Sequence, residues 1–573
     1  MKLLAIVLAV AAAYAMSASA AVARTETPLD TPGSFPAVMR SLVTIDAPMP
    51  ADVSGVPAEC QRLSYYRYRN ASGPTDRQEA DAILVGMPGI LGGAASLEMN
   101  ALQVVQRAAE TGRSVEYWAL DRRTNCLEDR RGLDAAKRAG DMRRAVDYYY
   151  RGASIDGKKF AGWGLSKKLR WLKSVDLRQV LEDERAVIVD GLPDPHVRET
   201  KTFCGGHSLG GLITGLFLAW DFDGDKATSD DAGSRLCGAG SFALDTLVTA
   251  DPIGLQTLPD VNRLLRLPMG LGHKGISGLI ARGDIPRLVD FGFINPQVIS
   301  LLSAVALNAK LAPQADSAPL IASVPDTPSV KAALRFFHSG NGEDARAPVP
   351  LLRRQHLTGE ALLGAFIDDN TQPLAFTEAS IGMYDDGPLL RKRYPFSPNA
   401  TSDPILGFQL GSQPLVVPAG NELRGWRRYD ESLPDHRRAN GAPVTSAASE
   451  VTDIRDIERT FGEGPLDFVE AYFPMQLVVD VLFGQAGDRG GDLSSIRYPQ
   501  APRGMPRVTL LGGESFTMRI LKVGLRDLPS DLQVIPGYQH LDIVTASPQQ
   551  PGGGKEPVAE AVTELVIEHI PAA

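Results

Sequence analysis

The chain has few cysteines, no long basic run, and no long apolar segment beyond its first residues. Only four of its 573 residues are cysteines, and no C-x-x-C spacing or nearby histidine pair is present, so the common sulfur- and imidazole-bound metal sites are not expected. The net charge is -9 at pH 7, and the basic residues form only short patches, which argues against a nucleic-acid partner. The most apolar later segment, around residues 298–311, is interrupted by polar residues and is too short to span a bilayer.

The composition is that of a folded globular protein. Hydrophobic residues make up 44% of the chain and charged residues 22%, so wholesale disorder and low-complexity architecture are excluded. The length exceeds that of one compact core, which favours either a large domain with a sizeable insertion or two domains.

The first residues have the form of a secretory signal peptide. A basic start and an apolar stretch at residues 3–13 are followed by small residues at Ala18-Ser19-Ala20 or Ala21-Val22-Ala23, which suit cleavage by signal peptidase. We therefore expect residues 1–23 to be removed and the mature protein to be secreted or periplasmic. A permanent membrane anchor is the alternative, although no stop-transfer pattern follows.

An even number of cysteines in an exported chain predicts disulfides. Cys60, Cys126, Cys204 and Cys237 allow two bonds in three connectivities. We favour pairing Cys204 with Cys237, because these residues would lie on sequential and adjacent strands.

Strand and helix signals alternate through the first half of the chain. After a loose, proline-rich segment at residues 24–57, the continuous apolar run at 82–85 and the stretches at 63–69 and 114–120 are typical of strands, and residues 96–111 of a helix. This order predicts a doubly wound, mostly parallel α/β sheet.

The alternation stops after a strand at residues 241–245 and returns at residue 507. Helical stretches at 297–311 and 467–483 lie between these points, and the sheet-like pattern then ends in a helix near 557–569. We read residues 251–500 as a mainly helical cap or lid over the carboxyl edge of the sheet, with the core at 24–250 and 501–573. A separate domain with its own task is the alternative.

The motif with most chemical content is Gly206-His207-Ser208-Leu209-Gly210, which reads G-x-S-x-G. It follows a short apolar strand and precedes an apolar helix, the context in which a sharp turn exposes the serine hydroxyl. Glycines on either side are needed because a side chain there would collide with the neighbouring strand or helix. Ser208 is therefore the candidate nucleophile.

A serine hydroxyl needs a base, and His540 is the best placed of the eight histidines. It directly follows a predicted strand near the C-terminus, in the chain order expected for this turn motif. His207 precedes the nucleophile, so we expect its side chain to point away from Ser208 and to line the pocket.

These motifs resemble those of the α/β-hydrolase superfamily, serine esterase and lipase type. The resemblance covers residues 60–250 and 507–573: Gly206–Gly210 matches the nucleophile turn, and Gly537–His540 looks like the histidine loop. Pro88-Gly89-Ile90 falls where the family usually has His-Gly-x after its third strand. The long insertion occupies the family's cap or lid position.

An oxyanion hole requires two N–H donors. Leu209, directly after the nucleophile, supplies one, and the resemblance implies Ile90 as the second. Pro88 has no N–H, and the departure from His-Gly leaves Met87 or Gly89 open as alternatives.

The triad acid is less well marked. The resemblance places it after the penultimate strand, where the sequence has Glu514 and no aspartate, so Glu514 is the first candidate and Asp245 the alternative. We expect Asp542 to cap the next helix and Asp121-Arg122-Arg123 to form surface ion pairs. Lining the mouth of the site is the alternative for these last three residues.

Together these features predict a secreted serine hydrolase that cleaves carboxylic esters through an acyl-enzyme, without a metal or organic cofactor. A small-molecule or lipid-like ester is the expected substrate, by analogy with the fold. A peptidase or acyltransferase with the same triad is the nearest alternative, and a non-catalytic binding protein on this fold is another.

Overall fold

The computed structural model describes residues 23–164, 168–225, 228–251, 259–395, 415–484, 491–524 and 531–570. The predicted signal peptide therefore lies almost wholly outside the described residues. Within these ranges, none of the helices combines the length and apolarity that crossing a membrane requires.

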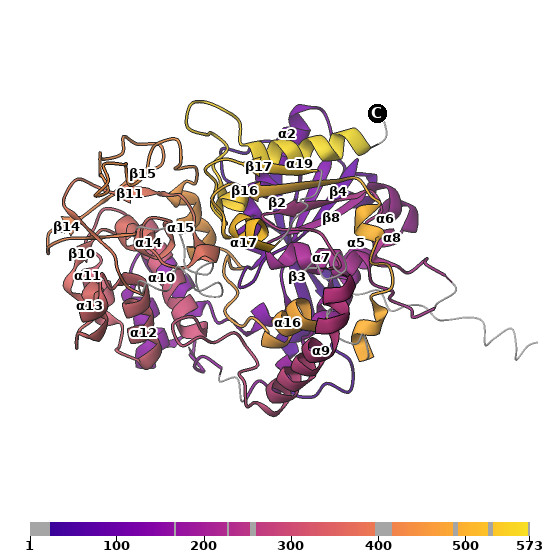
Figure 1. Ribbon diagram of the computed structural model, residues 1–573, viewed down its shortest axis with the longest axis horizontal. Coiled ribbons are helices and arrows are strands. Elements are labelled where there is room, and N and C mark those ends of the chain that lie inside the picture. Colours follow the sequence, from indigo (N-terminus) through magenta and orange to yellow (C-terminus); the bar gives the residue numbers. More distant parts are fainter. Residues whose placement is uncertain are drawn as a thin grey trace, which may run out of the picture.

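The described part of the chain is built on a nine-stranded sheet (Figure 1). From β5 to the far edge at β17 neighbouring strands run parallel, whereas β1, β2 and β3 are antiparallel to their neighbours. The sheet is thus mostly parallel, as the alternation of strands and helices predicts. Across the sheet the strands are β1 (Arg24–Leu29), β2 (Val38–Asp46), β3 (Arg62–Asn70), β5 (Val115–Leu120), β4 (Ala82–Met87), β8 (Thr202–His207), β9 (Gly240–Leu244), β16 (Arg507–Gly512) and β17 (Leu532–Ile535).

The expectation of a loose segment at residues 24–57 is wrong, because β1 and β2 form here. Val43 and Ile45 of β2 are almost fully buried, and β2 pairs along its whole length with β3. Pro28 lies in β1, at the edge of the sheet, where a missing N–H removes no ladder hydrogen bond from a central strand.

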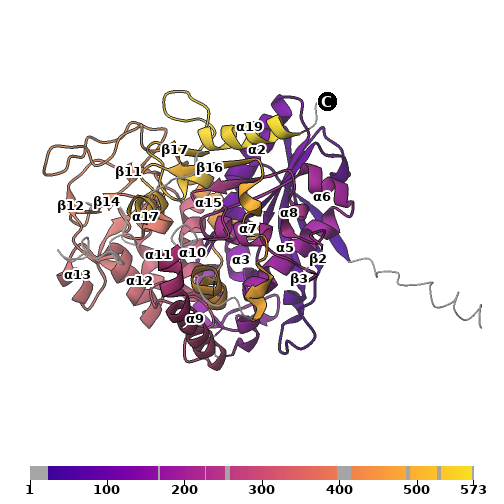
Figure 2. The same cartoon turned by 45° about the vertical axis from the view of Figure 1, so that its right-hand side comes forward.

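Helices cover both faces of the sheet. α2 (Glu98–Glu110) packs against the C-terminal helix α19 (Pro557–His569), while α5 (Leu177–Gly191) packs with α7 (Leu209–Leu218) and α8 (Gly233–Leu236). Figures 1 and 2 show the two groups on either side of the sheet. The other helices of this part are α3 (Arg131–Ala139), α4 (Arg143–Arg151), α6 (Pro195–Lys201), α17 (Phe516–Gly524) and α18 (Asp542–Thr545), with a small hairpin of β6 (Ser154–Ile155) and β7 (Lys158–Lys159).

The segment between β9 and β16 forms the insertion, which lies beside the sheet and its helices (Figure 1, left and below). Its centre is α10, which packs against α14 and α15. The described helices of the insertion are α9 (Pro259–Arg282), α10 (Pro296–Leu311), α11 (Ala318–Ser323), α12 (Pro328–His338), α13 (Gly342–Arg346), α14 (Gly359–Ile367), α15 (Ile454–Gly462) and α16 (Met475–Val479). Three short strand pairs join them: β10 (His356–Leu357) with β14 (Leu423–Arg424), β11 (Gly382–Tyr384) with β15 (Trp426–Arg428), and β12 (Leu389–Arg391) with β13 (Val416–Pro418).

One predicted helix of the insertion, at residues 467–483, begins later than its apolar pattern suggests, although helical structure continues to residue 484. Residues 467–474 are not helical, and α16 begins only after Pro474. Proline disfavours helical backbone in the residue before it, so the helix starts at the proline instead of running through it.

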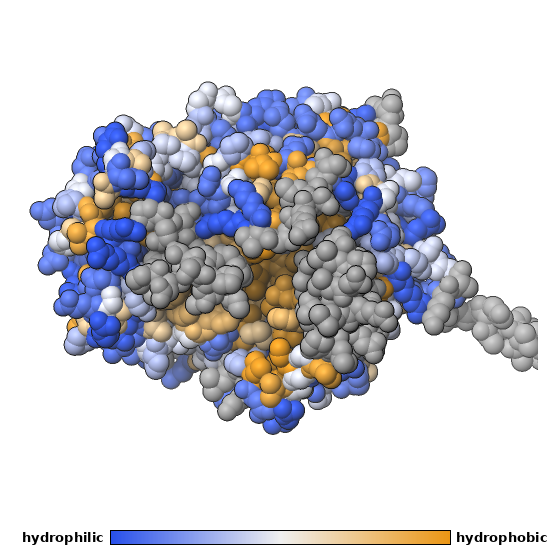
Figure 3. Space-filling model, viewed as in Figure 1, coloured by the Kyte–Doolittle hydropathy of each residue, from blue (hydrophilic) through white to orange (hydrophobic). Residues whose placement is uncertain are grey.

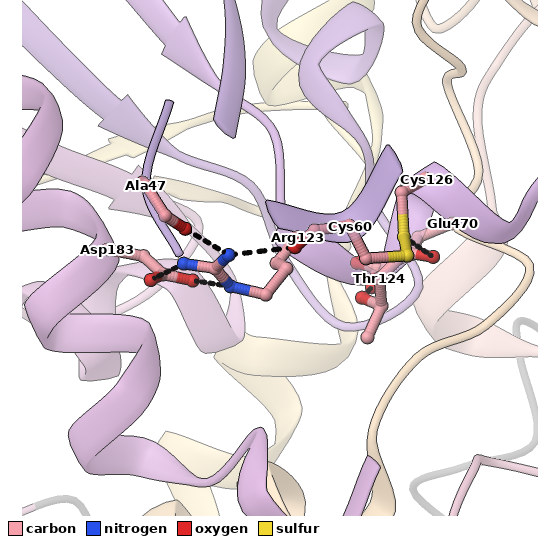
Figure 4. Close-up of a disulfide and its surroundings, with 7 residues drawn as sticks. All are labelled: Ala47, Cys60, Arg123, Thr124, Cys126, Asp183 and Glu470. Carbon is pink, nitrogen blue, oxygen red and sulfur yellow. Dashed lines mark hydrogen bonds and ion pairs between the residues drawn. A yellow bond between two sulfur atoms is a disulfide. The ribbon is translucent and has the colours of Figure 1, made fainter. Parts of the chain in front are cut away.

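Two disulfides link the described cysteines. The predicted Cys204–Cys237 bond is present, and Cys60 pairs with Cys126. Figure 4 shows the second bond beside Arg123, which donates hydrogen bonds to the carbonyl oxygens of Ala47 (2.6 Å) and Cys60 (2.8 Å).

Candidate active site

Ser208 lies at the sharp turn between β8 and α7. Its backbone has φ 54° and ψ -124°, a conformation that costs a non-glycine residue energy and is held by its surroundings. Ser208 N donates to the carbonyl oxygen of Leu244 at 3.0 Å. A Cβ on Gly206 would lie 2.6 Å from Met87 O, and one on Gly210 would lie 2.1 Å from that same oxygen. The two glycines of the motif are therefore required by the close approach of β4.

The structure brings His540 to this turn and pairs it with Asp245. Nδ1 of His540 lies 2.5 Å from Oδ2 of Asp245, and both side chains are almost fully buried. Oδ1 of Asp245 accepts a hydrogen bond from Gly512 N at 2.9 Å. His540 and Ser208 line the same cavity.

Glu514, the first candidate for the acid, is not at this position. Its side chain is exposed, and its N–H donates to Tyr538 O at 3.2 Å in the turn that follows β16. The structure places the alternative, Asp245, against His540 instead. Asp245 directly follows β9 and has a φ of 48°, and this left-handed turn directs the chain beside the histidine loop.

His207 contacts the histidine loop, residues 537–540. Its Nε2 lies 3.0 Å from the carbonyl oxygen of His540, and the two rings are 4.5 Å apart. Burial lowers the pKa of His207 to about 3, so the ring is neutral at neutral pH. A carbonyl can only accept, so the proton of the neutral ring is on Nε2. His207 also lines the cavity, as the sequence predicts.

Two backbone segments lie close to Ser208. Leu209 is the first residue of α7, so its N–H has no acceptor within the helix. On the other side, a Cβ on Gly89 would lie 2.9 Å from Cβ of Ser208, which shows how closely the loop after β4 approaches. Gly89 and Ile90 both line the cavity.

A buried arginine holds this loop. Nη1 of Arg122 donates to Gly92 O at 2.8 Å, and Nη2 donates to Gly89 O at 3.0 Å and to Pro88 O. The guanidinium also pairs with Glu470 at 2.8 Å. Arg122 thus fixes the carbonyl groups of residues 88, 89 and 92, in the loop that we call the 88–92 loop.

The expectation that Asp121, Arg122 and Arg123 form surface ion pairs is wrong. Arg122 and Arg123 are both buried, and each donates to backbone carbonyl groups as well as to a carboxylate. Charged side chains reach the interior only when such partners satisfy them. The local sequence around Arg122 and Arg123 gives no signal that they are buried, because their hydrogen-bond partners come from distant segments of the chain.

Asp542 does not cap α18 from the N-cap position, which is Leu541. Its buried carboxylate accepts hydrogen bonds from Gln539 N (2.8 Å), Ser380 N (2.9 Å) and the hydroxyl of Thr452 (2.8 Å). It therefore ties the histidine loop to the insertion.

The cavity at Ser208 is small and apolar, with a volume of about 90 Å³. No Asp, Glu, Lys or Arg is among the described residues that line it. On the face seen in Figure 3, hydrophobic residues line a hollow between the insertion and the core. The apolar side chains at the cavity come from the 88–92 loop, from α10, α12, α14 and α15, and from the segments that follow α14 and α15. They include Ile90, Leu91, Val298, Ile299, Leu302, Phe337, Phe366, Phe376, Phe461 and Phe468.

No protein-family model and no curated protein sequence matches the chain. Among solved structures, it is similar to the peroxisomal alpha-beta-hydrolase Lpx1 from Saccharomyces cerevisiae, with 10% identity over 97% of this chain and 93% of that chain and a TM-score of 0.29. It is also similar to proline iminopeptidase from Mycobacterium smegmatis, with 10% identity over 95% of this chain and 98% of that chain and a TM-score of 0.24.

Both TM-scores are too low to assign a fold, which has to come from the topology of this chain. Its sheet is mostly parallel, helices cover both faces, and a serine stands at a strained strand-to-helix turn in the middle of the sheet. A long insertion separates β9 from the last two strands. This sheet and this turn are those of the α/β-hydrolase fold.

Proposed function

We propose that the chain is an exported serine hydrolase that cleaves carboxylic esters. The observation that supports this most is the hydrogen bond between His540 and the buried Asp245 at a cavity that also contains Ser208. Two disulfides and the signal-peptide pattern at residues 1–23 support export, because disulfides persist in oxidising compartments.

In the proposed mechanism, Nε2 of His540 takes the proton of the Ser208 hydroxyl as its oxygen attacks the ester carbonyl carbon. Asp245 accepts the Nδ1 proton and stabilises the imidazolium that forms. The N–H groups of Leu209 and Ile90 stabilise the oxyanion, at about 3 kcal/mol for each donor. The alcohol leaves with the proton from His540. Water then attacks the acyl carbonyl carbon while His540 takes its proton, and His540 returns a proton to the Ser208 oxygen as the bond to the acyl group breaks and the acid leaves.

The cavity favours an uncharged, apolar acyl or aromatic group. Its described lining has no charged side chain that could pair with an ammonium or carboxylate group on the substrate. Burying such a charged group without a partner would be costly. A volume of about 90 Å³ suits a short chain better than a long one. We therefore propose an esterase with a preference for short apolar acyl groups.

The first test is covalent labelling of Ser208 with a fluorophosphonate probe. We expect wild type to be labelled and to hydrolyse p-nitrophenyl esters, most rapidly those with short acyl chains, and Ser208→Ala to do neither. Circular dichroism of the variant provides the folding control. Wild type that resists the probe would favour a non-catalytic binding protein, and faster cleavage of a peptide substrate would favour a peptidase.

A further inference from the structure

Three carboxylates gather inside the insertion, next to the loop that carries His540. Asp368 and Asp369 directly follow α14, and Glu450 lies shortly before α15. One oxygen atom from each of the three lies within 4.8 Å of the other two. The side chains of Asp368 and Glu450 are fully buried, and Asp369 is partly buried.

The hydrogen-bond partners of this cluster are uncharged. Asn370 donates to Asp368 from its backbone N–H (3.0 Å) and to Asp369 from its side chain (2.6 Å). Glu450 accepts from Gly382 N at 2.6 Å and from a threonine hydroxyl. Among the described residues no arginine or lysine forms an ion pair with the three carboxylates. Buried charges of one sign require a counter-charge or must be neutralised by protons.

The side-chain amide of Gln539 contacts the cluster through its nitrogen, and its oxygen is unsatisfied. Its Nε2 lies 3.0 Å from Oδ2 of Asp369. Its Oε1, on the same amide, is buried and has no partner among the described residues, and the residue is only 4% exposed. Because the two ends of an amide are assigned from their contacts, a half-turn would place Oε1 beside Asp369. Two oxygens at that distance are stable together when a cation lies between them.

We propose that Asp368, Asp369, Glu450 and Gln539 bind a divalent cation of the Ca²⁺ type. All four offer oxygen atoms, which hard cations prefer. Ca²⁺ binds oxygens at about 2.3–2.6 Å, so ligands on opposite sides of the ion are about 4.6–5.2 Å apart. The largest separation in the cluster, within 4.8 Å, fits this coordination sphere. Water and backbone oxygens complete it.

This cation would join the insertion to the histidine loop. Gln539 directly precedes His540, and Asp542 already holds the same loop to Ser380 and Thr452 of the insertion. Binding at the cluster would therefore stabilise the position of the imidazole. This consequence for catalysis rests on the proposed function, whereas cation binding does not.

The test uses the full chain, stripped with EDTA, desalted and titrated with CaCl₂ in a calorimeter and in thermal unfolding. We expect a saturable heat of binding and a Tm that rises by about 3 °C or more at saturating Ca²⁺. Asp369→Asn and Glu450→Gln should lose both responses. Asp386→Asn removes an exposed carboxylate (85%) of the same insertion and should keep both.

The proposal would be overturned if wild type showed neither heat of binding nor a change in Tm up to about 10 mM Ca²⁺, a concentration well above the Kd of ordinary Ca²⁺ sites. Protonation would then account for the cluster, since burial raises the pKa of Asp368 and Asp369. Unchanged Ca²⁺ binding in both cluster variants would also overturn it. Ca²⁺ binding by a protein that resists the fluorophosphonate probe would support the cation site and contradict only the proposed catalysis.

Discussion

At the residue scale, the candidate site depends on which carboxylate contacts His540. Asp245 is fully buried, and its two oxygens are divided between the histidine and the N–H of Gly512. An ionised carboxylate in this position holds the imidazole with its proton on Nδ1 and leaves Nε2 free to act as the base. Glu514, on the exposed turn after β16, has no such geometry.

We expect Asp245→Asn to lower kcat for a short p-nitrophenyl ester by about 10²–10⁴-fold, because an amide donates to Nδ1 and favours the wrong tautomer. Glu514→Gln should remain within about twofold of wild type, as expected for an exposed side chain. Steady-state kinetics with thermal melts of both variants provides the comparison. The opposite order, with a large loss in Glu514→Gln alone, would return the acid to Glu514.

The sequence predicts Ser208 and His540 because both have local signals: a glycine-flanked turn and a position directly after a strand. The acid has no such signal. Choosing Asp245 over Glu514 requires knowing that β9 and β16 are neighbours and that Asp245 turns toward the histidine loop. The burial of Arg122 could not be predicted from the sequence either, since its partner Glu470 lies hundreds of positions away along the chain.

At the element scale, the 88–92 loop has little backbone support of its own: Gly92 N donates to Gly89 O at 3.1 Å, and Gly92 forms an isolated bridge with Val469. Arg122 supplies further support by binding the carbonyl oxygens of Pro88, Gly89 and Gly92. In a trans peptide the C=O and N–H groups point in opposite directions. Fixing the Gly89 carbonyl toward Arg122 therefore turns the N–H of Ile90 away from the guanidinium.

Arg122→Lys tests this support. Lysine keeps the charge beside Glu470 but lacks the planar fork that reaches several carbonyl groups. We expect kcat to fall about 10- to 100-fold with little change in KM, because oxyanion donors act in the transition state. Arg123→Lys is the matched control: its guanidinium binds Asp183 and the carbonyls of Ala47 and Cys60, so it should lower Tm without this loss of kcat. Equal kcat values in the two variants would contradict the role of Arg122.

The sequence predicts an element correctly where the element's own pattern of residues determines it. The prediction fails where a neighbouring segment determines the structure. The apolar runs that became β4, β5 and β8 are buried on all sides, so their sequences alone identify them. β1 is mostly exposed and contains a proline, and it is a strand because β2 lies beside it. The apolar pattern of residues 467–483 suggests one helix, but Pro474 sets where α16 begins.

At the scale of the whole molecule, the insertion and the core share their interior. Most of their buried apolar side chains form one contiguous cluster, and Leu511, Met518 and Leu521 form a small second one within the core. Ion pairs cross the boundary as well: Arg122 with Glu470, Arg459 with Glu98, and Arg130 with Asp467. The cavity lies at this junction, so both parts contribute to its shape and neither forms it alone.

Buried carboxylates without a partner make the stability of the molecule depend on pH. Glu184 of α5 is 2% exposed, and neither of its carboxylate oxygens has a hydrogen-bond partner among the described residues. Burial raises its pKa from 4.5 to about 8, although the charge of Arg122 opposes the shift. Between these two values the folded chain holds a proton that the unfolded chain releases. Stability therefore falls as pH rises through this range, by up to about 1.4 kcal/mol per pH unit.

Glu184→Gln removes this titration and keeps the shape of the side chain. Between pH 6 and pH 8 we expect wild type to lose up to about 2.7 kcal/mol more free energy of unfolding than the variant, since one proton is released over two pH units. Urea unfolding at pH 6, 7 and 8 measures the difference. Glu564→Gln, an exposed carboxylate on α19, should follow wild type. Parallel curves for wild type and Glu184→Gln would mean that Glu184 is already ionised in the folded chain and has a counter-charge.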